Sequence, residues 1–160
     1  MLRLTIPEDT PSLVAQAAGT KFFYAHEIDT LKEVLDDYHV ESHADGHRAY
    51  TWLEDGVPMG FAYIAPTPMT DRTWELWWIV VDVAMQGKGL GGKLLLAAEQ
   101  AVLSESGRLL CIDTSGLPKY EPTRRFYLKY GYTECAHVPD FYRDGDDKVI
   151  FAKQLKANIV

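Results

Sequence analysis

A glycine-rich turn separates an apolar segment from a helical segment near the middle of the chain. Thr73–Val81 is apolar and aromatic, which predicts a central strand, and Gly87–Gly92 contains four glycines in six residues. Glycine lacks Cβ, so its backbone adopts positive φ and approaches a ligand closely. The helix predicted over Gly89–Leu103 presents N–H groups and a dipole that favour an anion. Lys88 and Lys93 add positive charge, so the turn predicts a phosphate site.

Three phosphate-binding motifs fit this turn. Gly87–Gly92 satisfies G-x-G-x-x-G, the dinucleotide fingerprint, and Asp113 follows about 20 residues on, where that motif has its acidic residue. Gly87–Lys93 fits G-x-x-x-x-G-K of the nucleotide hydrolases, but Leu94 stands where a Ser or Thr must hold magnesium. Gln86–Gly91 fits a third pattern, Q/R-x-x-G-x-G. A glycine-rich strand–helix connection that binds nothing is the remaining alternative.

In its third pattern the chain resembles the GNAT superfamily of acetyl-CoA-dependent N-acetyltransferases. In that family the backbone N–H groups of this loop hold the pyrophosphate of coenzyme A. The resemblance implies acetyl-CoA as co-substrate and no metal. It also implies that the cofactor is bound by Gln86, Gly87, Lys88, Gly89, Leu90, Gly91, Gly92 and Lys93.

Residue patterns predict the other elements of the chain. Alternation predicts a first strand over Leu2–Ile6, and Pro11 after Asp9 or Thr10 marks a helix start. Asp55-Gly56 is a strong two-residue hairpin turn. The remaining predictions are helices over Ile28–Tyr38 and Pro122–Gly131, and strands over Tyr50–Glu54, Val57–Ile64, Leu109–Ile112, Tyr132–Val138 and Lys148–Leu155.

The predicted order of elements, β-αα-βββ-α-β-α-ββ, decides between the motifs. A Rossmann sheet places its fingerprint after the first strand and repeats βαβ units around it. Here two helices and a hairpin precede the glycine turn, which excludes the dinucleotide fold. The order matches the GNAT fold over nearly the whole chain. We therefore expect an α/β (α+β) fold with a mixed sheet of about six or seven strands and about four flanking helices.

Length and composition limit the class of protein. The chain has 160 residues, 47% hydrophobic and 12% aromatic, which predicts one globular domain over residues 1–160. A net charge of −7 argues against nucleic acid as partner. No run reaches the ~18 apolar residues of a membrane span, and no secretory leader is present, so a cytoplasmic location is expected. Cys111 and Cys135 are interpreted as core thiols, without disulfide or metal.

Glu75 is the candidate general base. It lies on the predicted central strand, eleven positions before Gln86. The resemblance places the glutamate base of the histone acetyltransferase branch at this offset. Strand alternation predicts that Glu75 shares a face with Trp77, Ile79 and Val81, where an apolar setting would favour its use as a base. The alternative is a glutamate at the edge of the core, paired with an arginine such as Arg72.

Tyr127 is the candidate acid for the leaving thiolate. Phe126-Tyr127 followed by Tyr130-Gly131-Tyr132 resembles the aromatic pair and x-x-x-G-F/Y of the late helix in the family, whose tyrosine faces the sulfur of coenzyme A. An amphipathic helix with packing aromatics is the alternative. The resemblance also assigns extended backbone at Val81 and Val83 to the pantetheine amides, and an N–H near Val81 to the developing oxyanion.

The acceptor amine, either a small molecule or a peptide, is less defined. Tyr120 replaces an asparagine that contacts pantetheine in many members, so it either loses that contact or lines the substrate pocket. An acidic loop follows Tyr142 and either attracts a cationic amine or solvates a hairpin; it contains Asp144, Asp146 and Asp147. The candidate acceptor-site residues are Phe23, Tyr24, Trp77, Tyr120 and Tyr142.

Three further predictions complete the sequence interpretation. His39, His43 and His47 recur at intervals of four, but Asp45-Gly46 interrupts any helix between them, which favours surface histidines over a metal site. A homodimer is expected because dimers are common among such folds. The predicted activity is transfer of acetyl from acetyl-CoA to a primary amine in a ternary complex. The alternative is a non-catalytic acyl-CoA sensor or regulatory subunit.

Overall fold

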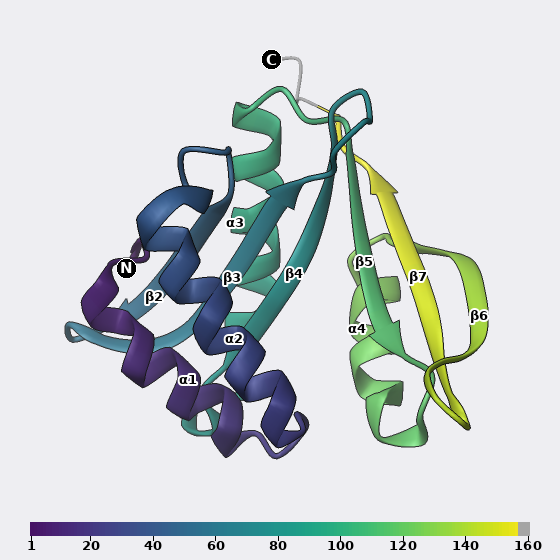
Figure 1. Cartoon of the computed structure of the whole chain (residues 1–160), viewed down its shortest axis with the longest axis horizontal. Helices are drawn as coiled ribbons and strands as arrows, with labels where there is room; N and C mark the ends of the chain where they lie inside the picture. The colour runs from purple at the N-terminus through teal and green to yellow at the C-terminus, as the bar shows by residue number, and fades with distance from the viewer. Residues whose placement is uncertain (157–160) are drawn as a thin grey trace.

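The computed structural model describes residues 1–156 and shows a mixed seven-stranded sheet with helices on both faces (Figure 1). The strands are β1 (Leu2–Leu4), β2 (Arg48–Glu54), β3 (Val57–Pro66), β4 (Thr73–Val81), β5 (Leu109–Ser115), β6 (Thr133–Arg143) and β7 (Asp146–Gln154). The helices are α1 (Thr10–Gly19), α2 (Ala25–Asp37), α3 (Leu90–Ser104) and α4 (Glu121–Lys129). The order β-αα-βββ-α-β-α-ββ predicted from the sequence is confirmed.

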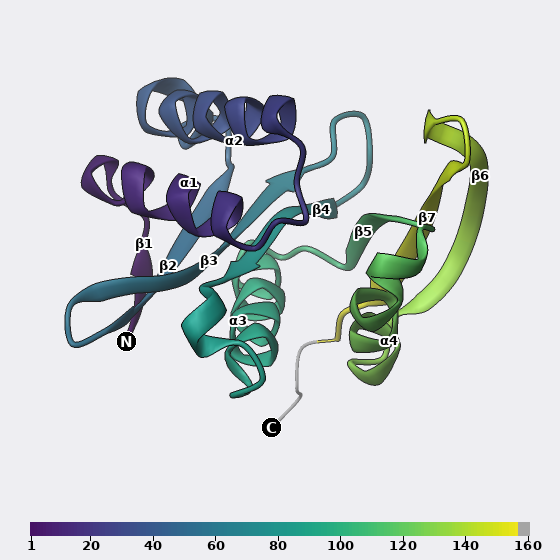
Figure 2. The same ribbon diagram turned by 90° about the horizontal axis from the view of Figure 1, so that it is seen from below.

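The strands lie in the order β1-β2-β3-β4-β5-β7-β6. Only the β4–β5 pair is parallel among the strand pairs of residues 1–156, and the others are antiparallel. Helices α1 and α2 cover one face of the sheet, and α3 and α4 lie against the other (Figure 2).

Each face of the sheet has its own apolar core. Leu94 and Leu95 of α3 pack with Leu110 and Phe151 on one face. On the other face, side chains of α1 and α2 pack against β3 and β4; they include Leu13, Leu31, Leu35, Phe61 and Val80. Strand β4 contributes residues to both cores. The central strand is therefore fixed from both sides.

Turn chemistry accounts for two of the connections. Asp55 and Gly56 both have positive φ, 49° and 79°, as a two-residue hairpin turn between β2 and β3 requires. Gly131 follows α4 with φ of 86°, the left-handed conformation that glycine adopts readily after a helix. The two turn signals in the sequence therefore act where they were expected.

Two element boundaries differ from the sequence prediction. Helix α2 begins at Ala25 rather than Ile28, because the Tyr24 N–H donates to Glu27 Oε2 at 2.6 Å and extends the first turn. The acidic loop is a tight turn, since β6 runs on to Arg143 and β7 begins at Asp146. Asp146 is consequently a strand residue.

The interpretation of both cysteines as core thiols is wrong for Cys135. Cys111 on β5 is half-buried, whereas Cys135 on β6 is exposed, and both are free thiols. Strand β6 pairs only with β7 and every residue along it is exposed, so an apolar pattern there does not imply burial. Within residues 1–156, no helix is long and apolar enough to cross a membrane.

Asp9 fastens the N-terminal segment to the sheet. It is only 4% exposed, and Arg3 donates to both of its carboxylate oxygens at 2.6 and 2.9 Å. The Ile6 N–H and the Thr51 hydroxyl donate to Oδ2 at 3.0 and 3.2 Å. Burial alone would raise the pKa of Asp9, but these hydrogen bonds and the Arg3 charge outweigh burial and lower it.

We expect Asp9→Asn to lower the free energy of unfolding at pH 7 by about 1–3 kcal/mol, because it weakens charge-assisted bonds to a buried group. A lowered pKa in the folded state gives stability that is present above about pH 4 and is lost as the pH falls through the folded value. The difference from the wild type should therefore shrink at pH 3. Urea unfolding at both pH values measures it.

Asp36→Asn is the matched control, since Asp36 pairs with Lys32 on the exposed face of α2. It should change stability by no more than about 0.5 kcal/mol at either pH. Equal losses in the two variants would contradict the role of Asp9.

Candidate active site

Strands β4 and β5 part halfway along their length. Their pairing runs from Thr73 with Leu109 to Leu76 with Ile112 and stops there. Strand β4 nevertheless continues to Val81, and β5 stays paired with β7 as far as Ser115. The two strands diverge below this point in Figure 1. The sheet is thus split beside the end of β4.

A β-bulge in β4 lies at the start of this split. Tyr63 of β3 is opposite Trp78, whereas the next residue, Ile64, is opposite Leu76. Trp77 is therefore the extra residue, and it is 45% exposed. A bulge bends its strand and reverses the alternation of side chains beyond it. It therefore helps β4 to turn away from β5.

The bulge overturns one prediction about Glu75. Simple alternation placed Glu75 on the face of Ile79 and Val81, but that prediction is wrong. Leu76 and Ile79 both belong to the core beneath α3, so the odd-numbered residues change face between them. Glu75 and Trp77 instead lie on the α2 side, beside Val34.

Glu75 lies in a recess of about 380 Å³ that it shares with Cys111 and Asp113. Its Oε2 accepts a hydrogen bond from Trp77 Nε1 at 3.2 Å. Arg72, the alternative partner considered from the sequence, pairs with Asp71 instead. The recess opens toward the split between the strands, since Trp77, Trp78, Asp113 and Tyr142 line both spaces.

The glycine turn is shaped as its sequence requires. Gly87 and Gly89 have φ of 74° and 81°, and Gly89 directly precedes α3. Asp82 Oδ1 accepts from the Ala84 N–H at 2.8 Å and caps a 3-10 turn over Val83–Met85. The expectation of extended backbone at Val83 is therefore wrong, because β4 ends at Val81 and the chain coils before the turn.

A groove of about 500 Å³ lies between the glycine turn and α4. The turn contributes the predicted residues Gln86, Gly87, Gly89, Leu90, Gly91 and Gly92 to its lining, and the end of β4 contributes Val81. A Cβ on Gly92 would stand 1.8 Å from the Tyr130 hydroxyl, so glycine is needed for this approach. Lys88 and Lys93 lie outside the lining and are exposed, with Lys93 Nζ 5.2 Å from the Trp52 ring.

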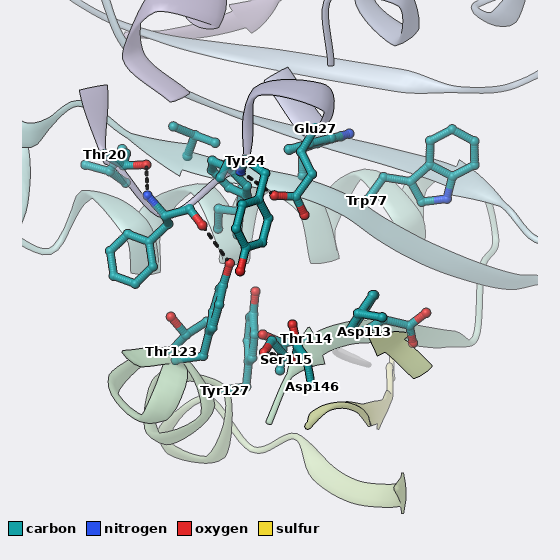
Figure 3. A pocket seen from close by; sticks show the side chains of 18 of the residues that line it. Thr20, Tyr24, Glu27, Trp77, Asp113, Thr114, Ser115, Thr123, Tyr127 and Asp146 are labelled. Atoms are coloured by element: carbon teal, nitrogen blue, oxygen red, sulfur yellow. Dashed lines mark hydrogen bonds between the residues drawn. The ribbon is translucent and has the colours of Figure 1, made fainter. Parts of the chain in front are cut away.

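A second cavity of about 450 Å³ fills the split between β4 and β5. Tyr24 and Glu27 face it from the start of α2, and Tyr127, Ser115 and Asp146 face it from the opposite side (Figure 3). The predicted acceptor-site residues Phe23, Tyr24, Trp77, Tyr120 and Tyr142 all line this cavity.

Tyr127 joins the groove to the cavity, because it lines both. The residue is 4% exposed, and its ring packs against Phe126, Tyr132 and Phe151. Burial raises the pKa of its phenol above the ordinary value, so the hydroxyl keeps its proton at neutral pH. The hydroxyl makes no hydrogen bond to other groups of residues 1–156.

The carbonyl of Phe22 closes the cavity on one side. It accepts from the Tyr120 hydroxyl at 3.0 Å and from Lys119 Nζ at 3.2 Å, which joins the α1–α2 connection to the segment before α4. Burial and the nearby Glu27 and Asp146 carboxylates raise the pKa of Tyr120 to about 12. Tyr120 therefore lines the cavity and also links two of its sides through a hydrogen bond.

Three carboxylates line the cavity: Glu27, Asp113 and Asp146. Sequence reasoning did not assign Glu27 or Asp113 to the acceptor site, and it named Asp146 only together with Asp144 and Asp147 as acids that either attract a cationic amine or solvate a hairpin. Asp146 came from an acidic loop whose members looked equivalent. Extending the buried positions Val149 and Phe151 backward by alternation points to Asp147, yet Asp146 is the buried one. The irregular pairing of Arg143 with Asp146 at the hairpin end breaks the period, so no simple signal identified it.

The three spaced histidines each contact aromatic or hydroxyl side chains, and His39 and His43 both pack edge-on against Tyr38. His39 Nε2 is 3.4 Å from Thr10 Oγ1, and His47 Nδ1 is 2.7 Å from the Tyr63 hydroxyl. The part of the chain described by the structure holds no group of three or more His, Cys, Asp or Glu side chains placed to bind a metal ion.

Comparison with known proteins identifies the family. The model of the acetyltransferase (GNAT) family matches residues 13–132, which is most of the chain. A crystal structure from Desulfovibrio desulfuricans, assigned to the GNAT acetyltransferases, is 36% identical and has a TM-score of 0.93. The alignment covers 98% of this chain and 99% of that one. The chain therefore belongs to the GNAT acetyltransferase family.

Two further relatives differ more in sequence. L-2,4-diaminobutyric acid acetyltransferase of Streptomyces avermitilis is 28% identical over 93 residues, which are 58% of this chain and 51% of that protein. The chain thus spans about half the length of this curated relative. An aminoglycoside 6′-N-acetyltransferase complexed with coenzyme A has a TM-score of 0.76 at 16% identity, covering 100% of this chain and 99% of that one, and it shares the fold.

Proposed function

We propose that this chain transfers an acetyl group from acetyl-CoA to a primary amine by direct attack in a ternary complex. The observation that carries the proposal is the junction at Tyr127. There, a groove lined by the glycine turn meets a separate cavity lined by aromatic and acidic side chains. Two substrates entering from these two spaces would meet beside one buried phenol.

The backbone chemistry of the groove suits coenzyme A. Gly87 and Gly89 have positive φ and precede α3, whose first-turn N–H groups and dipole favour a pyrophosphate. Beyond Leu76 the edge of β4 that faces away from β3 has lost its partner strand. Its peptide groups near Val81 could therefore pair with the pantetheine amides as an added strand would. An N–H of the same edge is the proposed donor to the oxyanion.

Tyr127 is the proposed proton donor to the departing thiolate. Its raised pKa keeps the phenol protonated, but it also makes complete proton transfer to a thiolate unfavourable by itself. A hydrogen bond from the phenol to the sulfur would grow stronger as negative charge develops there. The proposed effect of Tyr127 is therefore on the transition state rather than on cofactor affinity.

Glu75 is the proposed base, acting through water. It lies in the recess beside the cavity and does not line the cavity itself. Asp113 lines both spaces, so water between them would connect Glu75 with the acceptor amine. Amine substrates named for two relatives, diaminobutyric acid and aminoglycosides, support an amine acceptor here. The cytoplasmic location and the homodimer stay predictions.

Gly89→Ala should weaken coenzyme A binding about tenfold, because a Cβ at positive φ strains the turn that presents its N–H groups. Isothermal titration calorimetry measures the affinity. Gly56→Ala is the matched control, since Gly56 has nearly the same φ, 79°, and an added Cβ there would also meet open space. It should show a similar loss of stability and unchanged affinity. Equal affinity in the two variants would exclude this turn as the pyrophosphate site.

Tyr127→Phe should lower kcat about 100-fold with little change in acetyl-CoA affinity, because only the transition state loses a hydrogen bond. Release of free thiol measures the rate. Burial raises the pKa of the Tyr127 phenol above its ordinary value of about 10. Ionisation of this phenol should therefore not lower the wild-type rate at any pH up to 9.5. Tyr132→Phe also removes a buried hydroxyl, one that donates to Glu99 at 3.1 Å, and should keep kcat. A wild-type kcat in Tyr127→Phe would refute the role.

Glu75→Gln should lower kcat/KM by about 100-fold and flatten the rise of rate with pH, because an amide cannot accept the proton. The measurement is a pH–rate profile at saturating acetyl-CoA. Glu54→Gln is the control, since Glu54 on β2 accepts from Trp52 Nε1 at 2.7 Å in the same spacing, outside both cavities. A profile for Glu75→Gln that parallels the control would assign the proton to another acceptor.

A further inference from the structure

Three carboxylates line the cavity between β4 and β5, and two of them are already engaged. Asp113 is paired with Lys148 Nζ at 2.8 Å. Glu27 accepts from the Tyr24 N–H at 2.6 Å. The first contact is an ion pair between neighbouring strands. The second is a helix-start hydrogen bond to one oxygen of Glu27, and this residue is only half-buried, so solvent also reaches its carboxylate.

Asp146 differs from both because it is buried without a counter-charge. It is 4% exposed, and the Ser115 hydroxyl donates to its Oδ1. Within residues 1–156 no lysine, arginine or histidine lies within ion-pair distance of it, and Oδ2 makes no hydrogen bond. A buried charge is costly unless it is paired. The side chain nevertheless faces a cavity, from which a partner can reach it (Figure 3).

The cavity is also lined by one arginine, Arg143, whose charge is used in another contact. Arg143 lines the space, but its guanidinium stacks on the Tyr24 ring at 3.9 Å and forms no ion pair with Asp146. His26 also lines the cavity and stacks on Tyr24 at a ring distance of 5.8 Å. The charged groups in the lining are therefore Glu27, Asp113, Asp146 and Arg143, together with His26. Lys119 lies outside the lining, with its Nζ 5.2 Å from the Tyr24 and Tyr120 rings.

Aromatic side chains line the same cavity as Asp146, among them Tyr24, Tyr120 and Tyr142. Burial, followed by the charges of Asp113, Asp146 and Glu27, raises the pKa of Tyr142 to about 12. Burial, followed by the charges of Glu27 and Asp146, raises the pKa of Tyr120 to about 12 as well. Negative charge beside aromatic faces is the setting in which organic ammonium groups are held in proteins.

We propose that Asp146 binds the second ammonium of a diamine acceptor whose other amine is acetylated. The inference rests on the proposed function and gives its acceptor a chemical class. Asp146 lines the same cavity as Tyr127 and Val81, so one molecule can reach both. An alkyl monoamine would leave the buried carboxylate unpaired, whereas a diamine neutralises it.

The test compares α,ω-diamines of two to six methylene groups with n-alkylamines of the same length. Two variants are used, Asp146→Asn and the control Asp144→Asn. Asp144 is an exposed neighbour that lies outside the cavity lining. Binding is measured by calorimetry on the protein without turnover, and acetylation by thiol release. Thermal unfolding checks that both variants fold, and an asparagine retains an acceptor for Ser115.

The wild type should prefer one diamine over its matched monoamine by roughly tenfold or more in Kd and KM, the effect of one charge-assisted contact. Asp146→Asn should remove that preference by raising KM with kcat nearly unchanged, and Asp144→Asn should keep it. Equal affinity for diamine and monoamine in the wild type, or the same preference in both variants, would overturn the inference.

The closing experiment separates this inference from the proposed function. Selective diamine binding that needs Asp146, with no thiol release from acetyl-CoA, would sustain the ammonium-binding role of Asp146 and refute catalysis. Acetylation of mono- and diamines at equal KM would sustain catalysis and refute the role of Asp146. A loss of kcat for every amine in Asp146→Asn, at unchanged KM, would overturn the anchoring role in favour of proton transfer.

Discussion

The active site depends on competition for strand β5. Seven residues of β5 pair with β7, while only four pair with β4. Once β4 bulges at Trp77, its backbone can no longer follow β5, and the stronger partnership with β7 holds β5 in place. The edge of β4 that is released would cost hydrogen bonds in a closed sheet. In this fold the same edge offers peptide groups to a ligand and opens the cavity beside Tyr127.

Local chemistry explains how much of the fold could be predicted. The Asp55-Gly56 hairpin, the glycine turn before α3 and Gly131 after α4 each need a particular backbone conformation. These signals are local, so the order of elements could be predicted from the sequence. The bulge at Trp77 depends instead on which residues of β3 lie opposite it, and alternation alone placed Glu75 on the wrong face. Non-local pairing is invisible to a pattern of period two.

The same distinction applies to the site. Tyr127 and the Gln86–Gly92 loop belong to contiguous motifs, and the structure places both at the groove. Asp146 belongs to no motif, and only the irregular end of the β6–β7 hairpin turns it inward. Its neighbours have other tasks: Asp147 binds His137 and the Asp140 N–H, and Asp144 is exposed. Three acids that are equivalent by composition thus become distinct by position.

The hydrogen bond from the Tyr120 hydroxyl to the Phe22 carbonyl connects the two sides of the split in the sheet. The two halves of the sheet are fastened to each other by the four paired residues of β4 and β5 at one end. At the other end the span is bridged by Tyr120 and Lys119, whose hydrogen bonds reach a residue nearly a hundred positions earlier. The split in the sheet is therefore closed at both ends, by strand pairing at one end and by side-chain hydrogen bonds at the other. Tyr120 thus joins two segments that are far apart in sequence across the cavity.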